Sequence, residues 1–383
     1  MPYYQKRGQI PNKRHIQFRD NKGNLYWEEL ISREGFNHIY SNVYHIHPPT
    51  AVQKIGDITV LPLEEWNQTH RHHHLKTREL DHNGDAVASR IPLFFNSDVI
   101  LSKAHTSQSM NSLYRNGHHD ECLFVHSGKG TLKSNFGSLP LIGGDYAIIP
   151  RGVIWKLEIE KPMELLVVET AGPIETPDRY RNRLGQLLEH SPFSERDIKT
   201  PQYENPVSDG PIEVVVRLAQ GLQSYEYRHH PFDIVGWDGC YFPWAFNVND
   251  FMPITGKVHQ PPPVHQVFQA PGLVICNFVP RIFDYHPEAV PAPYAHSNVD
   301  SDEILYYVSG DFMSRRDVEE GSITYHPAGL PHGPQPDKIE ESLGAKEANE
   351  IAVMVDAFHP LKMTTAAADI DESEYPFSWI DNS

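Results

Sequence analysis

Two stretches in the second half of the chain decide the fold: residues 303–310, EILYYVSG, and residues 321–333, GSITYHPAGLPHG. The first has the spacing E-x6-G and the second has the spacing G-x5-P-x-G-x2-H. The second stretch predicts a strand over 322–326, a stop at Pro327, a turn at Gly329 and a resumed chain at His332. Because this geometry aims one imidazole at a fixed point, we expect a ligand there.

The same spacing of glutamate, glycine and proline occurs earlier in the chain. Glu121 begins an E-x6-G stretch 182 residues before Glu303, and Gly144 begins a G-x5-P-x-G-x2 stretch. At the last position of this earlier copy stands Trp155 instead of histidine. Two copies with equal internal spacing indicate a duplicated structural unit.

Short runs of apolar, β-branched and aromatic residues dominate the sequence between turn residues, and the chain contains 32 prolines. This pattern is typical of an all-β sandwich or barrel. The predicted strands cover residues 58–61, 99–101, 122–125, 146–149, 165–168, 273–279, 304–308 and 351–355. Helical patterns are few, the clearest over 178–188 and a weaker one over 339–348.

The charge balance excludes several classes of partner. Lys and Arg number 33 against 50 Asp and Glu, which gives a formal net charge of -17. Such a chain repels phosphate backbones and anionic lipid surfaces, so we expect no nucleic-acid or membrane partner. Three widely spaced cysteines, and the lack of an apolar run of signal-peptide or membrane-spanning length, predict a soluble cytoplasmic protein.

The paired motifs resemble the two signature motifs of the cupin superfamily. This resemblance implies a bicupin, an all-β fold of two double-stranded β-helix (jelly-roll) barrels with few short helices. The polar, proline-rich stretch that begins at residue 191 indicates a crossover between the halves. We therefore predict an N-terminal cupin-like domain with a degenerate metal site over 1–190, a crossover linker over 191–230 and a C-terminal metal-binding cupin domain over 231–383.

The cupin resemblance also implies a metal site in the second half. Its first motif supplies histidine ligands five to seven residues before the glutamate, and here His296 and Asn298 stand seven and five residues before Glu303. Together with His332 this gives two imidazoles and one carboxylate, the set favoured by non-haem Fe(II) oxygenases, although Zn²⁺ can use the same ligands. A single histidine is as readily a structural residue, but three ligand types on three motif positions favour a metal.

In the first half the corresponding positions hold Tyr114, Asn116 and Trp155. None of these side chains is a usual metal ligand, so we expect this barrel to have lost its metal. His118 and His119 lie only three and two residues before Glu121, which indicates a loop leading into the strand.

A closer resemblance is to the homogentisate 1,2-dioxygenase family, over residues 258–334. It rests on the stretches VHQPPPVHQVFQAPG, NFVPRIF, PYAHSN, SDEILYYVSGDF and HPAGLPHGP. The resemblance implies a non-haem iron extradiol-type dioxygenase of tyrosine and phenylalanine catabolism. Such an enzyme uses Fe(II) and O2 to convert homogentisate, a small aromatic substrate, to maleylacetoacetate. It also implies a homo-oligomer, trimer-based.

The same resemblance assigns roles to individual residues. His296, Glu303 and His332 match the iron ligands. His259 matches the catalytic histidine that accepts or steers a phenolic proton, a role suited to an imidazole, with His265 as its competitor. The residues expected to bind substrate are His326, Arg281 and Phe312.

Two departures from the family pattern leave alternatives open. The spacing from His296 to the carboxylate is one residue longer than usual, so that Asp302 competes with Glu303 as the metal ligand. Phe312 stands where the family often has tyrosine. A bicupin dioxygenase acting on a gentisate-like or hydroxyanthranilate-like aromatic, or a non-catalytic metal-binding bicupin, therefore remains a competing hypothesis.

Two further segments are predicted to lie at the surface. HRHHHLK, residues 70–76, is expected to form an exposed basic loop, because neighbouring residues of a strand face opposite ways and do not converge on a metal. The acidic tail, DIDESEYPFSWIDNS, is expected to be solvated, with Phe377 and Trp379 docked on a neighbouring surface.

Overall fold

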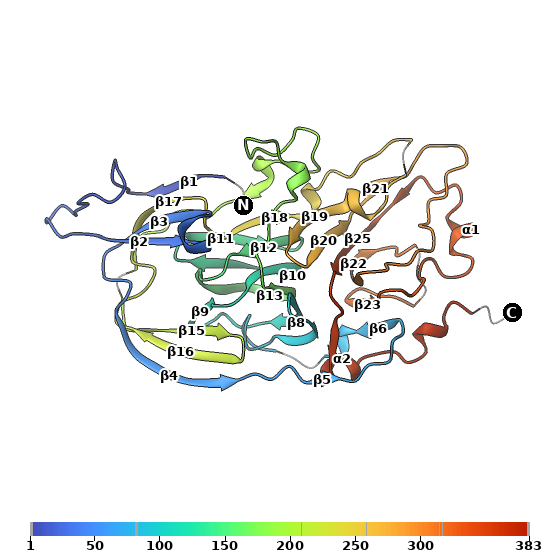
Figure 1. Cartoon of the computed structure of the whole chain (residues 1–383), viewed down its shortest axis with the longest axis horizontal. Helices are drawn as coiled ribbons and strands as arrows, with labels where there is room; N and C mark the ends of the chain where they lie inside the picture. Colours follow the sequence, from blue (N-terminus) through green and yellow to red (C-terminus); the bar gives the residue numbers. More distant parts are fainter. Residues whose placement is uncertain are drawn as a thin grey trace.

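The computed structural model of the chain describes residues 3–80, 83–207, 209–257, 259–313, 315 and 317–380. Its regular secondary structure is almost entirely β, with the N-terminal strands toward one end and most of the C-terminal strands toward the other (Figure 1). The prediction of an all-β bicupin with few short helices is confirmed. Each run of residues predicted as a strand lies mostly within an observed one.

The largest sheet has 14 strands and contains the first copy of the repeated motif. Nine of its strands follow one path of neighbours: β14 (Ile198–Lys199), β18 (Trp244–Asn247), β12 (Asp145–Ile149), β10 (Asp120–Ser134), β13 (Ile154–Thr170), β8 (Val99–Thr106), β7 (Ile91–Phe95), β26 (Lys362–Thr364) and β5 (Glu65–Trp66). Five strands branch from it: β11 (Gly137–Ile142), β9 (Leu113–Asn116), β15 (Ile212–Leu218), β16 (Gly221–Tyr227) and β4 (Val52–Val60).

A six-stranded sheet contains the second copy of the motif. Its order is β19 (Gln266–Ala270), β20 (Leu273–Phe278), β25 (Glu350–Ala357), β22 (Asp302–Gly310), β23 (Ser322–His326) and β6 (His73–Lys76). Two smaller sheets complete the fold: β1 (Gln5–Gly8), β17 (Ile234–Gly239), β3 (Tyr40–His45) and β2 (Trp27–Ser32) form one, and β21 (Arg281–Ile282) and β24 (Glu347–Ala348) form the other.

Helices are short throughout the described residues. The two α-helices are α1 (Lys338–Ser342) and α2 (Thr365–Ala368), and the 3-10 turns are η1 (Glu34–Phe36), η2 (Thr77–Glu79), η3 (Asp178–Tyr180), η4 (Glu195–Asp197), η5 (Val248–Asp250), η6 (Pro262–His265) and η7 (Tyr375–Phe377). None of the described helices has the length and apolarity needed to cross a membrane.

The helix predicted over 178–188 is wrong. Only η3 forms there, and the chain then turns back, with Arg181 bridging Leu187. The Asn182 side chain accepts hydrogen bonds from the amides of Leu184 and Gln186, which gives the backbone an alternative to helical hydrogen bonding. Gly185 completes the turn with a φ of 86°.

Strand pairing crosses both of the predicted domain boundaries. β15 and β16 lie within the predicted linker 191–230, yet β15 pairs with β9 and β16 pairs with β4. β18 belongs to the predicted C-terminal domain, yet it pairs with β12. The division of the chain at residues 190 and 230 stays a prediction. Strands on either side of these boundaries pair with one another.

The prediction for residues 70–76 is wrong. Residues 73–76 form β6, which pairs antiparallel with β23 and closes one edge of the six-stranded sheet (Figure 1). His73 and His74 are fully buried, and each imidazole binds a carboxylate of the C-terminal segment. The segment is basic in the sequence, but Asp371 and Glu372 neutralise it from about 300 residues away in the chain.

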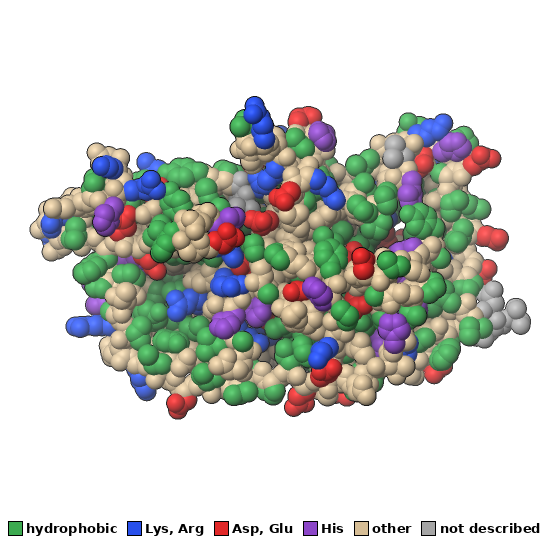
Figure 2. Space-filling model, in the orientation of Figure 1, with side chains coloured by type: hydrophobic (Ala, Val, Ile, Leu, Met, Phe, Trp, Pro, Cys, Tyr) green, Lys and Arg blue, Asp and Glu red, His purple; other side chains and the backbone are tan. Residues whose placement is uncertain are grey.

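Charged side chains of both signs are interspersed with hydrophobic ones over one face of the molecule (Figure 2). A surface of this kind lacks the single-sign field that attracts a polyanion.

Candidate metal centre

The strand register places Glu303 and His326 side by side. Glu303 is the second residue of β22 and pairs directly with His326, the last residue of β23. Side chains alternate along a strand, so two directly paired residues project from the same face of the sheet. Both are buried, Glu303 with 5% and His326 with 0% of its surface exposed.

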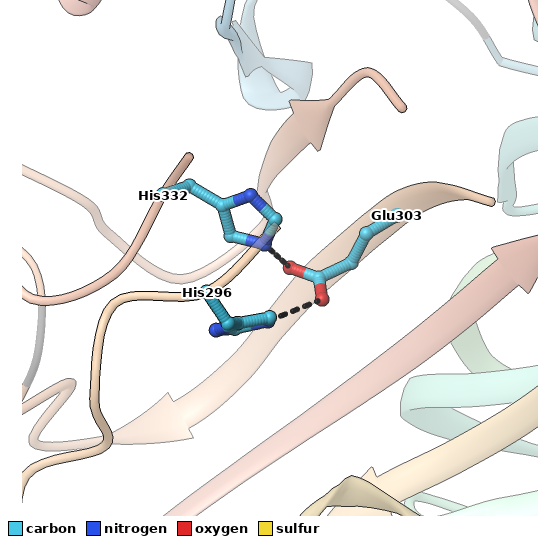
Figure 3. Close-up of side chains that lie close together, drawn as sticks. All are labelled: His296, Glu303 and His332. Carbon is cyan, nitrogen blue, oxygen red and sulfur yellow. Dashed lines mark ion pairs between the residues drawn. The ribbon is translucent and has the colours of Figure 1, made fainter. Parts of the chain in front are cut away.

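His296 and His332 come from two loops that join in a short bridge. The amide of each donates to the carbonyl of the other, both at 2.8 Å. The two imidazoles therefore lie close together, with ring centroids 4.3 Å apart, and both face the Glu303 carboxylate (Figure 3). Pro327 and Gly329 stand where the sequence predicted, between the strand and the returning histidine.

His296, Glu303 and His332 are the one group of potential metal ligands found among the described residues. The Nε2 atoms of His296 and His332 lie 3.8 and 3.5 Å from the two carboxylate oxygens of Glu303. Such separations suit atoms bound to one ion at about 2.1 Å each. One atom from each residue lies within 4.8 Å of the others.

Hydrogen bonding fixes which nitrogen of each histidine is available. The Nδ1 atom of His296 lies 3.3 Å from the Tyr294 carbonyl, and that of His332 lies 3.1 Å from the Leu330 carbonyl. Because a carbonyl only accepts, each Nδ1 carries the proton and each Nε2 presents a lone pair toward the carboxylate. Three acceptors face one another, and the buried Nε2 of His332 has no hydrogen-bond partner. This arrangement fits a cation, and the Nδ1 bonds are those that orient metal-bound histidines.

The electrostatics of the site keep the carboxylate ionised. Burial opposes the charge of Glu303, but the surrounding His296, His326 and His332 outweigh it and hold the pKa of the carboxyl well below its usual value. The same carboxylate raises the pKa of His296. Burial lowers the pKa of His326 to about 3, so this imidazole is neutral. The centre thus presents an anionic oxygen donor to the surrounding imidazoles.

The choice between Asp302 and Glu303 follows from what binds each carboxylate. Asp302 accepts from the Ala328 amide at 2.7 Å, the Leu361 amide at 2.6 Å and the Tyr325 hydroxyl at 2.9 Å. These bonds occupy both of its oxygens. Asp302 therefore joins neighbouring segments on the opposite face of β22, and Glu303 is the carboxylate that faces the two imidazoles.

His326 supports the centre rather than standing apart from it. Its Nδ1 donates to the Glu303 carboxylate at 2.8 Å, and its ring stacks on that of His332 with centroids 4.4 Å apart and an angle of 14°. Its Nε2 is buried and has no partner. One nitrogen fixes the carboxylate, and the other is a buried acceptor without a partner among the described residues.

The other residues predicted for the site lie at different distances from it. His259 is exposed, and its Nε2 lies 3.2 Å from the Tyr294 hydroxyl, with the Tyr294 ring 6.2 Å from that of His296. Its competitor His265 is buried, and burial lowers its pKa to about 3. Tyr294 thus lies between His259 and His296, which favours His259 over His265 as the predicted catalytic histidine.

Phe312 and Arg281 differ in their surroundings. Phe312 packs edge-on against Tyr307, which follows Glu303 by four residues on β22 and so projects from the same face. Arg281 forms an ion pair with Glu350 at 3.0 Å and lies over the rings of Phe278 and Phe283. None of the contacts of Arg281 involves the three ligand candidates.

The corresponding place in the first barrel holds an arginine. Arg90 donates to the fully buried Glu121 at 2.6 Å and lies over the rings of Tyr114 and Trp155. The Trp155 indole and the Tyr114 hydroxyl also donate to Glu121. The residues that replace the histidines therefore surround a carboxylate that already has a cation, which supports the prediction that this barrel has lost its metal.

Sequence reasoning did not place His72 or Trp379 beside the centre. The His72 ring lies 5.3 Å from that of His326 and 5.9 Å from that of His332. Trp379 packs on His72 at 5.3 Å and donates to the Gly333 carbonyl at 3.1 Å, so this part of the tail is docked as expected. His72 comes close to the centre because β6, which begins at the next residue, pairs with β23. No local sequence pattern predicts that pairing.

Comparison with known proteins shows which family the chain is similar to. Residues 93–248 match the family model described as "Homogentisate 1,2-dioxygenase N-terminal". A relative from Saccharolobus solfataricus, named as a "putative dioxygenase", is 42% identical over 383 residues and is matched over 99% of both chains. The homogentisate 1,2-dioxygenase of Nitrobacter hamburgensis is 29% identical over 279 residues, which cover 68% of this chain and 61% of that relative.

Solved structures with a similar fold are more distant. The protein Ylba from E. coli is 9% identical with a TM-score of 0.36, over 79% of this chain and 94% of that one. A cupin 2 conserved barrel protein from Leptotrichia buccalis is 9% identical with a TM-score of 0.35, over 75% of this chain and 96% of that one.

Proposed function

Because the chain belongs to the homogentisate 1,2-dioxygenase family, we propose that it is an Fe(II)-dependent ring-cleaving dioxygenase that converts homogentisate and O2 to maleylacetoacetate. The observation that carries the proposal is the convergence of His296, Glu303 and His332 on one point. Two imidazoles and one carboxylate are the donor set of non-haem Fe(II) oxygenases, since they leave positions for O2 and a chelating substrate.

The bound iron would supply the redox chemistry, and the protein supplies geometry and proton transfer. Homogentisate carries two phenolic hydroxyls, and binding through a ring oxygen requires the loss of a proton. His259 is the proposed acceptor of this proton, because its imidazole lies 3.2 Å from the Tyr294 hydroxyl on the side of His296. The free Nε2 of His326 is the proposed acceptor for the other substrate hydroxyl.

The aromatic surroundings support an aromatic substrate. Phe312 and Tyr307 provide apolar surface on the face of the sheet that carries Glu303. Phe312 has no hydroxyl to bind a carboxylate, so Arg281 is the proposed cation for the acetate arm, once released from Glu350. This requirement keeps a gentisate-like or hydroxyanthranilate-like aromatic as the second candidate substrate.

The remaining proposals concern assembly and location. We propose a trimer-based homo-oligomer in the cytoplasm, in line with the family. Its partners would be a small aromatic substrate and O2.

The test is oxygen uptake by protein from which metal has been removed and which has been reloaded anaerobically with Fe(II). Homogentisate should drive uptake of one O2 per substrate, and ¹⁸O2 should place both labelled atoms in the product. Gentisate and 3-hydroxyanthranilate are the comparison substrates. His332→Ala removes one ligand and should abolish uptake, whereas the exposed His70→Ala should leave it unchanged.

Uptake with gentisate alone would transfer the proposal to the second substrate class. No uptake with any of the three aromatics by iron-loaded protein would leave a non-catalytic metal-binding bicupin.

A further inference from the structure

The segment that carries His332 is held by hydrogen bonds at every carbonyl from residue 330 to residue 333. The Leu330 carbonyl accepts from the His332 imidazole, and the His332 carbonyl accepts from the His296 amide. The Pro331 carbonyl accepts from His72 Nε2 at 3.1 Å. The Gly333 carbonyl accepts from Trp379 Nε1 and from Arg315.

His72 differs from the two histidines that follow it. Both nitrogens of His73 are bonded, to Asp371 and to the Thr69 carbonyl. Both nitrogens of His74 are bonded as well, to Glu372 and to the Ser322 hydroxyl. These contacts anchor β6 without His72. The imidazole of His72 is therefore not needed to hold the strand in place.

The contacts of His72 point toward the metal centre instead. Its ring meets those of His326 and His332 at steep angles, 79° and 74°, so it packs edge to face against two side chains of the site. Trp379 covers its other side. Burial lowers the pKa of His72 to about 4, which keeps the ring uncharged beside the donor set.

We propose that His72, which the first half of the chain contributes, is a positioning residue of the metal centre in the second half. Its Nε2–H bond to the Pro331 carbonyl fixes the backbone that carries His332 and so sets the distance between that imidazole and Glu303. The effect on the metal should resemble that of other outer-shell partners, whose loss typically weakens metal binding by about 10- to 100-fold.

The inference rests on the proposed metal site but not on the proposed substrate. The test therefore measures Co(II) binding to the full-length protein without substrate, by competition with a chelator and by the visible spectrum of the bound ion. His72→Leu should weaken binding about tenfold or more and change the spectrum. His72→Gln should bind within about threefold of the unsubstituted protein, since its amide N–H reaches where Nε2–H lies.

The controls separate positioning from folding. His72→Asn has the polarity of glutamine but is one methylene too short to reach the Pro331 carbonyl, so it should behave as His72→Leu. His70→Leu removes an exposed histidine of the same segment and should leave binding unchanged. Melting temperatures of all four variants check that each is folded at the temperature of the titration.

Equal Co(II) affinity in His72→Leu and the unsubstituted protein would overturn the inference, and so would equal affinity in the Gln and Asn variants. A failure of the metal site itself would look different, because His332→Ala would then bind Co(II) as the unsubstituted protein does. A failure of the substrate assignment would leave the Co(II) results intact and abolish only oxygen uptake with homogentisate.

Discussion

At the scale of single residues, the structure separates two adjacent carboxylates by what binds them. Glu303 faces three imidazoles, whereas Asp302 binds two amides and a hydroxyl on the other face of β22. The motif spacing predicted Glu303 as the ligand. The spacing did not predict that Asp302 accepts hydrogen bonds that join neighbouring segments. The donors belong to Tyr325, Ala328 and Leu361, which only the fold brings together.

This contrast predicts opposite phenotypes for two isosteric substitutions. Glu303→Gln removes the anionic donor and should lower Co(II) affinity at least about tenfold, since a neutral amide replaces a charged ligand. Asp302→Asn should leave Co(II) affinity nearly unchanged but cost about 1–3 kcal/mol of unfolding free energy, because an N–H would face an amide donor. Chelator competition and urea unfolding measure the two effects. Loss of Co(II) binding in Asp302→Asn alone would reverse the assignment.

Arg90 offers a second prediction at this scale. Its removal leaves the buried charge of Glu121 without its cation, so Arg90→Met should cost about 3–5 kcal/mol. Arg90→Met combined with Glu121→Gln should recover part of that loss. Lys129→Met is the matched control, because its half-exposed pair with Glu160, which joins β10 to β13, should contribute less than about 1 kcal/mol. Equal losses for Arg90→Met and Lys129→Met in chemical denaturation would contradict the prediction.

At the scale of elements, the repeated glycines have the same backbone conformation, with a positive φ, in both barrels. Gly128 and Gly310 have φ of 95° and 100°, and a Cβ on them would lie 2.1 Å from the Pro162 carbonyl oxygen and 2.0 Å from the Asn349 carbonyl oxygen, respectively. Gly152 and Gly329 also have positive φ, but a Cβ on either would meet nothing within 4 Å. The motif therefore encodes two different constraints, one of space and one of backbone angle.

Alanine substitutions should distinguish these two constraints. Gly329→Ala meets only the cost of a left-handed residue, about 1–2 kcal/mol. Gly310→Ala meets that cost and a collision with the Asn349 carbonyl, so it should lose more than about 2 kcal/mol. Urea unfolding of both variants provides the comparison, with Gly128→Ala expected to follow Gly310→Ala. A smaller loss for Gly310→Ala than for Gly329→Ala would be inconsistent with this account.

Local patterns predicted most strands and both repeated motifs, because each depends on neighbours in the sequence, and the family resemblance predicted the three side chains that converge. They failed where a distant segment decides the structure. Residues 70–76 are basic in isolation, and only Asp371 and Glu372 make them fit for burial. The predicted helix after Asp178 failed for a local reason, since the turn-forming side chain of Asn182 prevailed over a helical pattern.

At the scale of the whole molecule, the two halves exchange strands. β6 from the first half closes the sheet that carries Glu303 and His326, and β18 and β26 from the second half join the large sheet. Removing one of these exchanged strands would expose an edge of the sheet that it covers. An exposed edge can pair with other chains and cause aggregation. The metal centre is in this sense a property of the complete chain.

The exchange predicts that residues 231–383 do not form the metal centre by themselves. That fragment lacks β6 and the partners of β18, so it should be aggregated or largely unfolded and should not bind one equivalent of Co(II). Mixing it with residues 1–230 should restore binding at least in part. Circular dichroism and metal analysis after gel filtration measure the outcome. Full Co(II) affinity in the isolated fragment would show that its sheet needs no strand from the first half.

The stability of the whole molecule should also depend on pH through His45, which lies between Asp233 and Glu29. Burial opposes its charge, but these carboxylates outweigh it and raise the pKa of His45 from 6.5 to about 9. The raised pKa stabilises the fold fully below about pH 6.5, by up to about 3 kcal/mol, and this contribution is lost as pH rises through about 9.

The comparison of the unsubstituted protein with His45→Gln isolates this term from other titrations. The difference in their unfolding free energies should be largest near pH 6 and should shrink toward about pH 9.5. Denaturant midpoints at several pH values measure it. A difference that stayed constant across this range would mean that His45 is not charged in the fold.

The guanidinium in the first barrel has a consequence for life in an environment where iron is scarce. A positive charge that belongs to the polypeptide cannot be removed by a chelator or outcompeted by another ion. If the second barrel binds iron as proposed, starvation for metal would empty that site and leave the Arg90–Glu121 ion pair of the first barrel unchanged.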